Sequence, residues 1–487
     1  MSTRKLVIVL TFLGVFAMAA RLTIDTDTWW HLRAGAWILE NRQIPTVDLF
    51  SFTEFGNSWR YPGWFVQIPM VLIYSGLGPG GLNLWTAVMV TLAFALVWRV
   101  MPGGVLLRAF LVVFGATVAA VYWAARPYLV SFLLTALFLH ALESHRRGEK
   151  KAFWWLILGM ILWVNSHGAF IVGYLLWGAY GADAGIRWLF ARWKNLPAAP
   201  DLAVTVRQLL LIGATMTVTA GINPHGYRIL AYPFQTVSID ALGAVINEWQ
   251  SPNFADANVW PFAAMLFAVI AAVGWSRVRL TLVEFLLVAG FGALSLYAQR
   301  NIASFGLVVP LVLARHLDDV FTHLSTDLGW GMQLFVRERV PRPLAIINVG
   351  LALLVVLTVL AKLTLVVPPQ KNLAYFETVY PTGAVAYLQD SVPTGRMLNS
   401  YNWGGYLLWH VPDVPVFIDG RTDLYAGETI NQWLTAVWAG DGWEQVLETW
   451  DIQVILLETG APLLGELDRS QWEQVYVDTL AEIWVRR

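Results

Sequence analysis

The sequence has no cysteine among its 487 residues. Disulfide bonds, thiolate metal sites and cysteine nucleophiles are therefore excluded. Charged residues are also scarce, because they make up 13% of the chain, whereas a soluble protein carries about 25%. Hydrophobic residues make up 57%, and 26 residues are tryptophan. This composition predicts a polytopic α-helical membrane protein, and the formal net charge of −1 gives no reason to expect a nucleic-acid partner.

Sequence patterns that would indicate several other activities are also missing. No Gly-rich loop follows a predicted strand, so a site for ATP or a nucleotide sugar is unsupported. No Gly-x-Ser-x-Gly elbow of a serine hydrolase is present. The chain shows no repeated halves with broken helices, which a transporter would tend to have. A long first outward loop and a separate outward domain favour an extracytoplasmic enzyme instead.

Eleven apolar runs are long enough to span a membrane. They fall near residues 5–20, 82–100, 109–124, 128–142, 152–168, 169–190, 207–221, 259–275, 281–298, 301–315 and 344–366. The first run follows a basic N-terminus like that of a signal peptide, but no convincing cleavage site precedes Arg21, so we expect a transmembrane helix. The shorter run at 64–77, closed by a Gly-rich segment, is expected to form a partly inserted or re-entrant helix.

The basic residues predict on which side of the membrane each loop lies, because cytoplasmic loops are enriched in Lys and Arg. With the N-terminus in the cytoplasm, the basic clusters all fall on that side. They are Arg99 with Arg108, Arg146 to Lys151, Arg187 to Lys194, Arg277 with Arg279, and Arg337 to Arg342. Segments 21–63 and 222–258 then form long extracytoplasmic loops. This pattern predicts a multi-pass protein, and the loop style together with the absence of Cys fits a bacterial inner (plasma) membrane.

The last quarter of the chain differs in composition from the rest. Pro368 and Pro369 open segment 367–487, in which short apolar strands alternate with helices. We expect a soluble extracytoplasmic α/β domain there, following a transmembrane domain at residues 1–366. Its predicted elements are buried strands at 396–399, 414–418 and 452–457, a helix at 405–410, and a hairpin of strands 474–477 and 482–485.

Polar residues at the outward helix ends are the functional candidates, because such residues are costly near a membrane. They are Asp25, Asp27, His31, Arg33, Arg126, Asn165, His167, Asn223, His225, Glu248, Gln299, Arg300 and Asn301, and we expect them to converge on one cavity. The segment from Ile24 to Arg33 has two interpretations. Either Trp29 and Trp30 anchor the chain at the headgroups beside solvated acids, or one acid is an active-site carboxylate.

The two outward arginines and the two outward histidines also leave alternatives open. Arg126 and Arg300 lie outside against the positive-inside bias, so each requires a negative partner. That partner is either a lipid phosphate, which suits a guanidinium, or Asp27 or Glu248 in a salt bridge. His167 and His225 could join the carboxylates in a divalent cation site, but no metal-binding spacing is present, and hydrogen-bonded structural histidines are favoured.

Five motifs in this order resemble the GT-C membrane glycosyltransferases, which take sugars from polyprenyl-phosphate or polyprenyl-diphosphate carriers. The pattern is most similar to the catalytic subunit of oligosaccharyltransferase. The matching segments are Asp27 to Arg33 for Asp-Pro-Trp-Phe-Asn-Tyr-Arg, Trp59 to Pro62 for Trp-Tyr-Pro, Val245 to Gln250 for Ser-Val-Ser-Glu-His-Gln, Gln299 to Asn301 for a late arginine, and Ser400 to Tyr406 for Trp-Trp-Asp-Tyr-Gly. The resemblance covers nearly the whole chain and implies a GT-C-like fold.

Two departures from the family pattern limit what the resemblance implies. The family has an acidic, metal-binding pair near Ala124 to Tyr128, where this chain has Arg126. A bound divalent cation (Mg²⁺ or Mn²⁺) is therefore in doubt, and Asp27 and Glu248 would be its ligands if one is bound. Trp403 stands where the family has the acid that reads the acceptor sequon. Transfer to Asn sequons is therefore not expected, and the acceptor is open.

The resemblance also implies roles for individual residues. Asp27 would be the base, with Asp25 as the competing candidate, and Glu248 would orient the acceptor. Arg300, with Arg126, would bind the donor phosphate. Contacts to sugar or acceptor would come from His31, Arg33, Trp59, His167, His225, Tyr401, Asn402 and Trp403.

Several hypotheses stay open at this point. The first is a glycosyltransferase that moves a sugar from a polyprenyl-linked donor to an extracytoplasmic acceptor. The alternatives are a non-catalytic membrane protein on the same scaffold, which binds a lipid-linked sugar or a protein partner, and a lipid transporter. Phe417 to Asp423, which follows a predicted strand, is either part of a ligand site or a structural turn with a local Asp–Arg pair.

Overall fold

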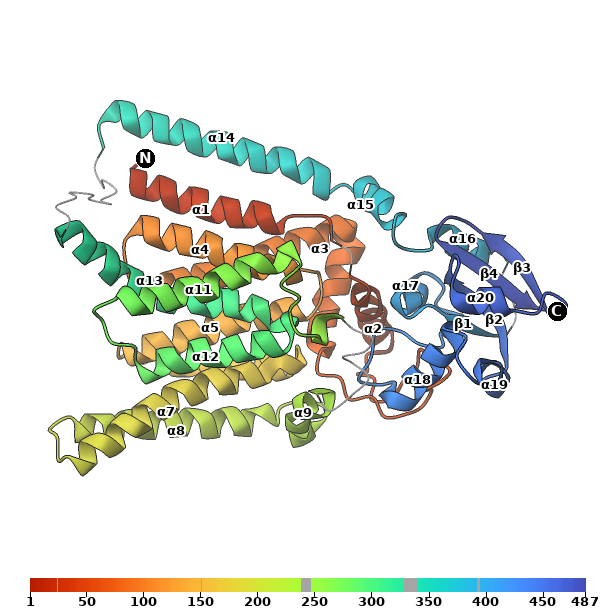
Figure 1. The fold of residues 1–487 in the computed structure, drawn as a ribbon, viewed down its shortest axis with the longest axis horizontal. Helices are drawn as coiled ribbons and strands as arrows, with labels where there is room; N and C mark the ends of the chain where they lie inside the picture. The colour runs from red at the N-terminus through yellow and green to blue at the C-terminus, as the bar shows by residue number, and fades with distance from the viewer. Residues whose placement is uncertain (24, 150, 238–246, 328–339, 392–394) are drawn as a thin grey trace.

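The computed structural model describes residues 1–23, 25–149, 151–237, 247–327, 340–391 and 395–487. The predictions that involve Ile24, Lys150, Val245, Ile246 and Arg337 to Arg339 fall outside these residues. The chain forms a helical bundle with a smaller mixed domain at one end (Figure 1). The N-terminus lies at the other end of the bundle, away from this domain.

All eleven predicted apolar runs are helical. The helices are α1 (Thr3–Ala19), α3 (Trp64–Val100), α4 (Val105–Ala119), α5 (Tyr128–Arg146), α6 (Ala152–Val164), α7 (Ile171–Trp193), α8 (Ala199–Ala220), α11 (Trp260–Trp275), α12 (Leu282–Tyr297), α13 (Ile302–Asp327) and α14 (Arg342–Val366). Among the described residues, seven helical segments are long and apolar enough to cross a membrane. The protein is therefore a multi-pass membrane protein, while the count of eleven spans stays a prediction.

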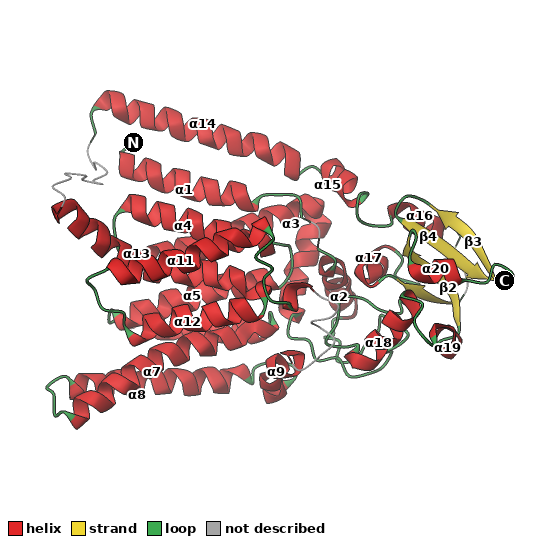
Figure 2. Cartoon of the chain, viewed as in Figure 1, coloured by secondary structure: helices red, strands yellow, loops and turns green. Residues whose placement is uncertain are grey.

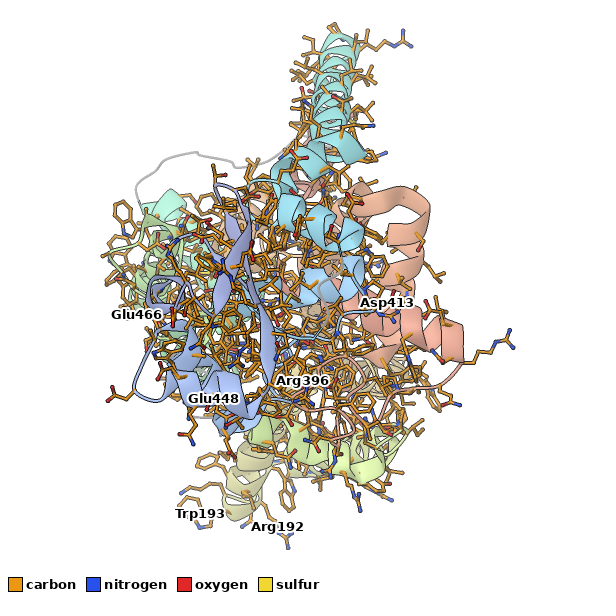
Figure 3. The ribbon with its side chains drawn as sticks, turned by 90° about the vertical axis from the view of Figure 1, so that its right-hand side faces the viewer. Arg192, Trp193, Arg396, Asp413, Glu448 and Glu466 are labelled. Carbon is orange, nitrogen blue, oxygen red and sulfur yellow. The ribbon has the colours of Figure 1, made fainter. Side chains whose placement is uncertain are left out.

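Helix α14 exposes apolar side chains on its surface. Its outward side chains are apolar, and Ile346, Leu354 and Leu357 are 72%, 60% and 62% exposed. A helix that is apolar on all sides suits lipid rather than water. It stands at the edge of the bundle in the view from the mixed domain (Figure 3). Two of its polar side chains hold it against the N-terminal segment: Asn348 donates to the carbonyl oxygen of Met1, and Lys362 donates to that of Ala17 in α1.

Helix α3 is divided by a kink at Gly78. The backbone there has φ 64°, which favours glycine. The apolar segment at 64–77 is thus a separate helical piece, as predicted, and Leu72 and Leu77 on it are exposed. How deeply this piece enters a membrane stays a prediction.

The mixed domain contains a four-stranded sheet in the order β1-β2-β4-β3 (Figure 2). Strand β1 (Arg396–Asn399) is parallel to β2 (Ile452–Glu458), and β3 (Trp472–Val477) and β4 (Ala481–Arg486) form the predicted antiparallel hairpin. The helices are α15 (Pro369–Phe376), α16 (Thr382–Asp390), α17 (Tyr401–His410), α18 (Ala426–Val437), α19 (Trp443–Thr449) and α20 (Pro462–Glu466).

The predicted strand at 414–418 is wrong. Only Val416 forms isolated bridges, one to Ser51 in the first outward loop and one to Met397. The segment is buried, as a strand would be, but other groups take its backbone hydrogen bonds. The Asn399 side chain accepts from the Phe417 N–H at 2.8 Å. The N–H of Phe52, in the first loop, donates to the Val416 carbonyl at 3.1 Å.

The first outward loop is docked on the mixed domain. It contains α2 (Asp27–Asn41), which lies between the bundle and the domain (Figure 1). The Trp29 ring meets the edges of Phe376, Tyr380 and Tyr406 at centroid distances of 5.0–5.6 Å. Trp29 and Trp30 are only 2% and 4% exposed. Of the two interpretations of this segment, the one in which the pair anchors the chain at the headgroups does not fit, because both rings pack inside the protein.

A buried ionic cluster fixes the same interface. The Arg421 guanidinium is bidentate on Asp419, with nitrogen–oxygen distances of 2.7–3.0 Å, and also binds Asp48 of the first loop. The Tyr425 hydroxyl donates to Asp419 at 2.7 Å. The Asp–Arg pair of segment 417–423 is therefore structural, as one of the two interpretations held.

Candidate active site

A polar cavity of about 470 Å³ lies where the bundle, the first outward loop and the mixed domain meet. Its charged lining residues are Asp25, Asp27, Arg126, Glu248, Arg300 and Asp423. Its aromatic lining residues are Trp30, His31, Tyr61, Tyr128, His167, Tyr232, Trp249 and Tyr401. The structure thus brings together the acids and both arginines that the sequence singled out.

The two aspartates of the first loop are held at the start of α2. The Asp25 Oδ1 atom accepts from the N–H of Asp27 at 3.0 Å, so Asp25 satisfies a free backbone donor next to the helix. Asp27 is in the first helical turn, where the helix dipole favours a negative charge. The Trp30 indole donates to its Oδ1 atom at 3.1 Å. Both carboxylates are therefore fixed in orientation.

Arg126 holds three carboxylates with its three nitrogens. The Nη1 atom lies 3.1 Å from Asp27 Oδ2, Nη2 lies 2.5 Å from Glu248 Oε1, and Nε lies 3.3 Å from Asp25 Oδ2. Burial would lower the pKa of Arg126, but the three carboxylates keep it well above its ordinary value. The interpretation of Arg126 as a salt-bridge partner therefore fits this structure, and its assignment to the donor phosphate does not, because its nitrogens already face carboxylate oxygens.

Arg300 is placed differently. It lies in the short 3₁₀ turn Gln299–Asn301 between α12 and α13. Gln299 fixes this turn to segment 247–250, because its side chain donates to the Asn247 carbonyl at 2.5 Å. The guanidinium stacks over the Trp249 ring at 4.3 Å. Within the described residues it forms no salt bridge, although the charge of Glu248 is near enough to act on it, so its guanidinium can also bind a ligand in the cavity.

The acids of the cavity differ in proton affinity. Burial, and next the charge of Asp25, raise the pKa of Asp27 to about 7. Burial also raises the pKa of Asp25. Burial would raise the pKa of Glu248 too, but Arg126 and Arg300 lower it below its ordinary value. Asp27 therefore changes charge close to neutral pH, as a general base must. Asp423 is a second cavity acid whose pKa burial raises towards that range, to about 6.

Four of the eight predicted sugar or acceptor contacts line the cavity. His31 and His167 lie on the bundle side, where Gln67 and Ser131 bond their Nδ1 atoms at 3.1 Å and 2.9 Å. Tyr401 and Asn402, at the start of α17, lie on the domain side. The Tyr401 hydroxyl is 2.9 Å from the Thr422 hydroxyl, which lines the cavity as well.

The other four lie outside the cavity. Arg33 pairs with Glu40 at 3.6 Å, and Trp59 is buried, with the Arg421 guanidinium 5.0 Å from its ring. Trp403 is buried inside the domain, where its indole donates to the Val379 carbonyl at 3.1 Å. His225 follows a turn closed by Asn223 and hydrogen-bonds to the backbone of Tyr61, so it stands next to the cavity without lining it. These side chains were predicted to line the cavity because the sequence does not reveal the residues that they pack against.

Two polar residues expected in the cavity are structural as well. Asn165 accepts from the Trp64 indole at 3.0 Å and donates to the Ile222 carbonyl at 2.7 Å, which connects three segments. Asn301 donates to the Leu294 carbonyl at 2.9 Å and so closes the end of α12.

Sequence reasoning did not name Tyr61, Tyr128 or Tyr232 as site residues, and it left Asp423 open between a ligand site and a structural turn. Burial raises the pKa of Asp423 to about 6, and the Tyr232 hydroxyl donates to it at 3.2 Å. Gly420, which lies between Asp419 and Asp423, could have indicated a site here, because a glycine permits the close approach of another segment. Apart from Tyr401, which lies in a motif, the cavity tyrosines do not stand out among the 16 tyrosines of the chain.

Comparison with known proteins gives a match at the level of the fold. The oligosaccharyltransferase of Archaeoglobus fulgidus in its apo form matches with a TM-score of 0.55 at 13% identity, over 92% of this chain and 69% of that chain. The chain has the fold of an oligosaccharyltransferase. AglB from the same organism, in complex with an inhibitory peptide and a dolichol-phosphate, has a TM-score of 0.52 at 14% identity, with the same coverage of 92% and 69%. No family model and no curated protein matches the sequence.

The resemblance of the motifs to oligosaccharyltransferases implies a divalent cation, so we tested the cavity residues against one. Such a cation needs several oxygen ligands at about 2.0–2.6 Å. Here Asp25, Asp27 and Glu248 surround the Arg126 guanidinium instead. Within the described part of the chain, no cluster of three or more His, Asp or Glu side chains has the geometry of a metal site. The arrangement therefore does not fit a divalent cation.

Proposed function

We propose that the protein is a membrane glycosyltransferase that moves a sugar from a polyprenyl-phosphate or polyprenyl-diphosphate carrier to an extracytoplasmic acceptor. One observation carries this proposal. Asp27, an acid with a pKa of about 7, and Arg300, a cation that forms no salt bridge among the described residues, line the same cavity beside an apolar bundle. A base and an anion-binding cation at a membrane surface are what transfer from a lipid phosphate requires.

The reaction follows from these two groups. An acceptor hydroxyl attacks the anomeric carbon, and the new carbon–oxygen bond forms as the bond from that carbon to the carrier phosphate breaks. Asp27 takes the hydroxyl proton, and the carrier leaves as its phosphate. Arg300 compensates the negative charge that develops on the leaving phosphate, because a guanidinium donates hydrogen bonds in a fork that matches phosphate oxygens. Asp25, two residues earlier in the chain, is the competing base.

The donor and the acceptor would approach from opposite sides of the cavity. The carrier lipid would come from the bundle side, next to Arg300. The acceptor would contact the domain side, where Tyr401, Asn402, Thr422 and Asp423 offer hydrogen-bonding groups. The AglB structure contains a peptide and a dolichol-phosphate, but Trp403 is buried here, which supports an acceptor other than an Asn sequon.

The same proposal implies an orientation of the protein in the membrane. The cavity must face the compartment that holds lipid-linked sugars, so the mixed domain would be extracytoplasmic. The N-terminus, at the opposite end of the bundle, would then be cytoplasmic (Figure 1), and the membrane would be the bacterial inner membrane.

The test is a transfer assay with purified protein in lipid nanodiscs and lipid-linked sugars extracted from the source membrane. We expect a new glycosidic product and free carrier phosphate, with no added nucleotide sugar. Donor that binds without turnover would support the non-catalytic alternative. Passage of unmodified donor across a liposome bilayer would support a transporter. Asp27→Asn is the matched variant, since it preserves the size of the side chain.

A further inference from the structure

The feature that the proposed function leaves unexplained is the attachment of three carboxylates to one arginine. Asp25 and Asp27 come from the first outward loop, Glu248 comes from the turn Asn247–Trp249, and Arg126 comes from the connection before α5. The Arg126 side chain is only 15% exposed. Three acids from two distant segments would repel one another in such a place unless a cation lay between them.

The backbone holds Arg126 in this position independently of the acids. Its N–H donates to the Ala124 carbonyl at 2.9 Å, and its own carbonyl accepts from the Leu129 N–H at 3.0 Å, at the start of α5. The Thr28 hydroxyl donates to the Ala125 carbonyl at 2.9 Å, which ties the connection to α2. The guanidinium is therefore part of a built site, unlike a flexible surface ion pair.

We propose that Arg126 is the resident cation of this active site: it takes the place of a divalent metal, positions Asp27 and Glu248, and makes the glycosyl transfer independent of metal ions. This inference rests on the proposed function. A guanidinium stays protonated at every physiological pH, so the site keeps its cation without recruiting one from solution. A divalent ion would have to enter beside this fixed positive charge.

The proposal also assigns different roles to Arg126 and Arg300. Arg126 faces carboxylate oxygens with all three nitrogens, whereas Arg300 faces none within the described residues. Arg126 is thus a positioning residue that orients the base, and Arg300 is the group that contacts the donor phosphate. Loss of Arg126 should leave donor binding largely intact but displace Asp27.

The first experiment needs no variant. We expect wild-type protein to turn over at an unchanged rate after chelation with EDTA, and electron paramagnetic resonance to detect no bound Mn²⁺ at millimolar concentrations of the ion. Turnover that EDTA abolishes and Mg²⁺ or Mn²⁺ restores would overturn the inference while leaving the proposed function in place. If wild-type protein shows no turnover with any donor, the proposed function fails, and the Mn²⁺ spectrum still tests the charge argument, because Mn²⁺ held by the wild-type cavity overturns it.

The second experiment exchanges the cation. Arg126→Ala should lose about 100-fold in turnover in EDTA, gain a Mn²⁺ signal from the freed carboxylates, and recover part of its turnover when Mn²⁺ is added. Arg126→Lys should retain more turnover than Arg126→Ala, since it keeps one positive charge. The matched control is Arg315→Ala, because Arg315 also pairs with a carboxylate, Glu284, at 2.6 Å, outside the cavity. A folded Arg126→Ala protein that gains no Mn²⁺ signal would contradict the inference. If this variant does not fold, the wild-type measurements decide.

Discussion

Gly420 of the mixed domain lies directly against Asp27 of the first outward loop, so closely that a Cβ atom on this glycine would overlap the Oδ1 atom of the carboxylate. The same Cβ would stand 3.2 Å from the Trp30 indole nitrogen, which donates to that oxygen. The domain therefore closes the cavity over the proposed base and leaves no room for a side chain. The close approach of Gly405 to the Thr26 carbonyl has the same effect at the start of α2.

Gly420→Ala should displace the Asp27 carboxylate and reduce turnover by at least about tenfold, because small misplacements of a reacting group are costly. Gly427→Ala is the matched control, since a Cβ there meets nothing within 4 Å. The measurement is turnover in the transfer assay together with thermal unfolding. Equal turnover in both variants would show that the contact with Gly420 does not position Asp27.

Asp27→Asn should bind the donor normally and lose about 10²- to 10⁴-fold in turnover, the usual contribution of a general base. The amide can still accept from the Trp30 indole, so the fold should be retained. Asp25→Asn is the companion variant, since both acids line the cavity. A larger loss in Asp25→Asn than in Asp27→Asn would assign the base to Asp25.

The pH dependence of turnover follows from the raised pKa of Asp27. The base acts only when ionised, and its pKa is about 7. We therefore expect kcat/KM to rise about tenfold per pH unit below 7 and to level off above it. Asp27→Asn should lack this rise. A rate that is flat between pH 5 and 8 would be inconsistent with Asp27 as the base.

Arg300→Ala should weaken binding of polyprenyl phosphate by about 10- to 100-fold, since a hydrogen bond to a charged group contributes about 1.5–3 kcal/mol. Its removal leaves no buried acid unpaired within the described residues, so the fold should persist. Native mass spectrometry of the lipid complex measures the effect. Arg33→Ala is the control, because Arg33 pairs with Glu40 outside the cavity; equal losses in both variants would remove Arg300 from the phosphate site.

Arg421→Ala should destabilise the protein by about 3–5 kcal/mol, because Asp48 and Asp419 would be left buried without their cation. The loss should appear as a lower unfolding temperature and as faster proteolysis of the first outward loop. Arg487→Ala, which removes an exposed pair with Glu473 at 3.7 Å, should change little. Similar unfolding temperatures for the two variants would show that the cluster does not fasten the domain.

Hydropathy and charge were sufficient to predict the helices, whereas the oligosaccharyltransferase-like fold followed from the resemblance of five motifs to that family. Apolar runs of spanning length can form little else in lipid, which is why all eleven were helical. The prediction of a strand at 414–418 was wrong because a buried segment need not pair with a neighbouring strand. The backbone groups of this segment form hydrogen bonds with the Asn399 side chain and with the first loop instead. Pairings between distant segments of this kind leave no local pattern in the sequence.

The charged residues of the site could be predicted, because a charge near a membrane is costly to keep. The roles of residues that depend on packing could not. Asp25, Asp27, Glu248 and Arg300 stood out as ionisable residues near a membrane, and the structure brings them together. Trp59 lies in a matching motif and Trp403 stands where a motif has an acid, and both proved to be buried packing residues. Their roles depend on neighbours such as Arg421 and Val379, which only the folded chain identifies.

The most direct test of the central proposal is an experimental structure of the protein with a bound polyprenyl-phosphate sugar. We predict that the phosphate lies within hydrogen-bonding distance of the Arg300 guanidinium and that the anomeric carbon faces Asp27 across the cavity. A donor phosphate bound elsewhere, with Arg300 turned onto Glu248 and the cavity closed to the bilayer, would contradict the proposed transfer.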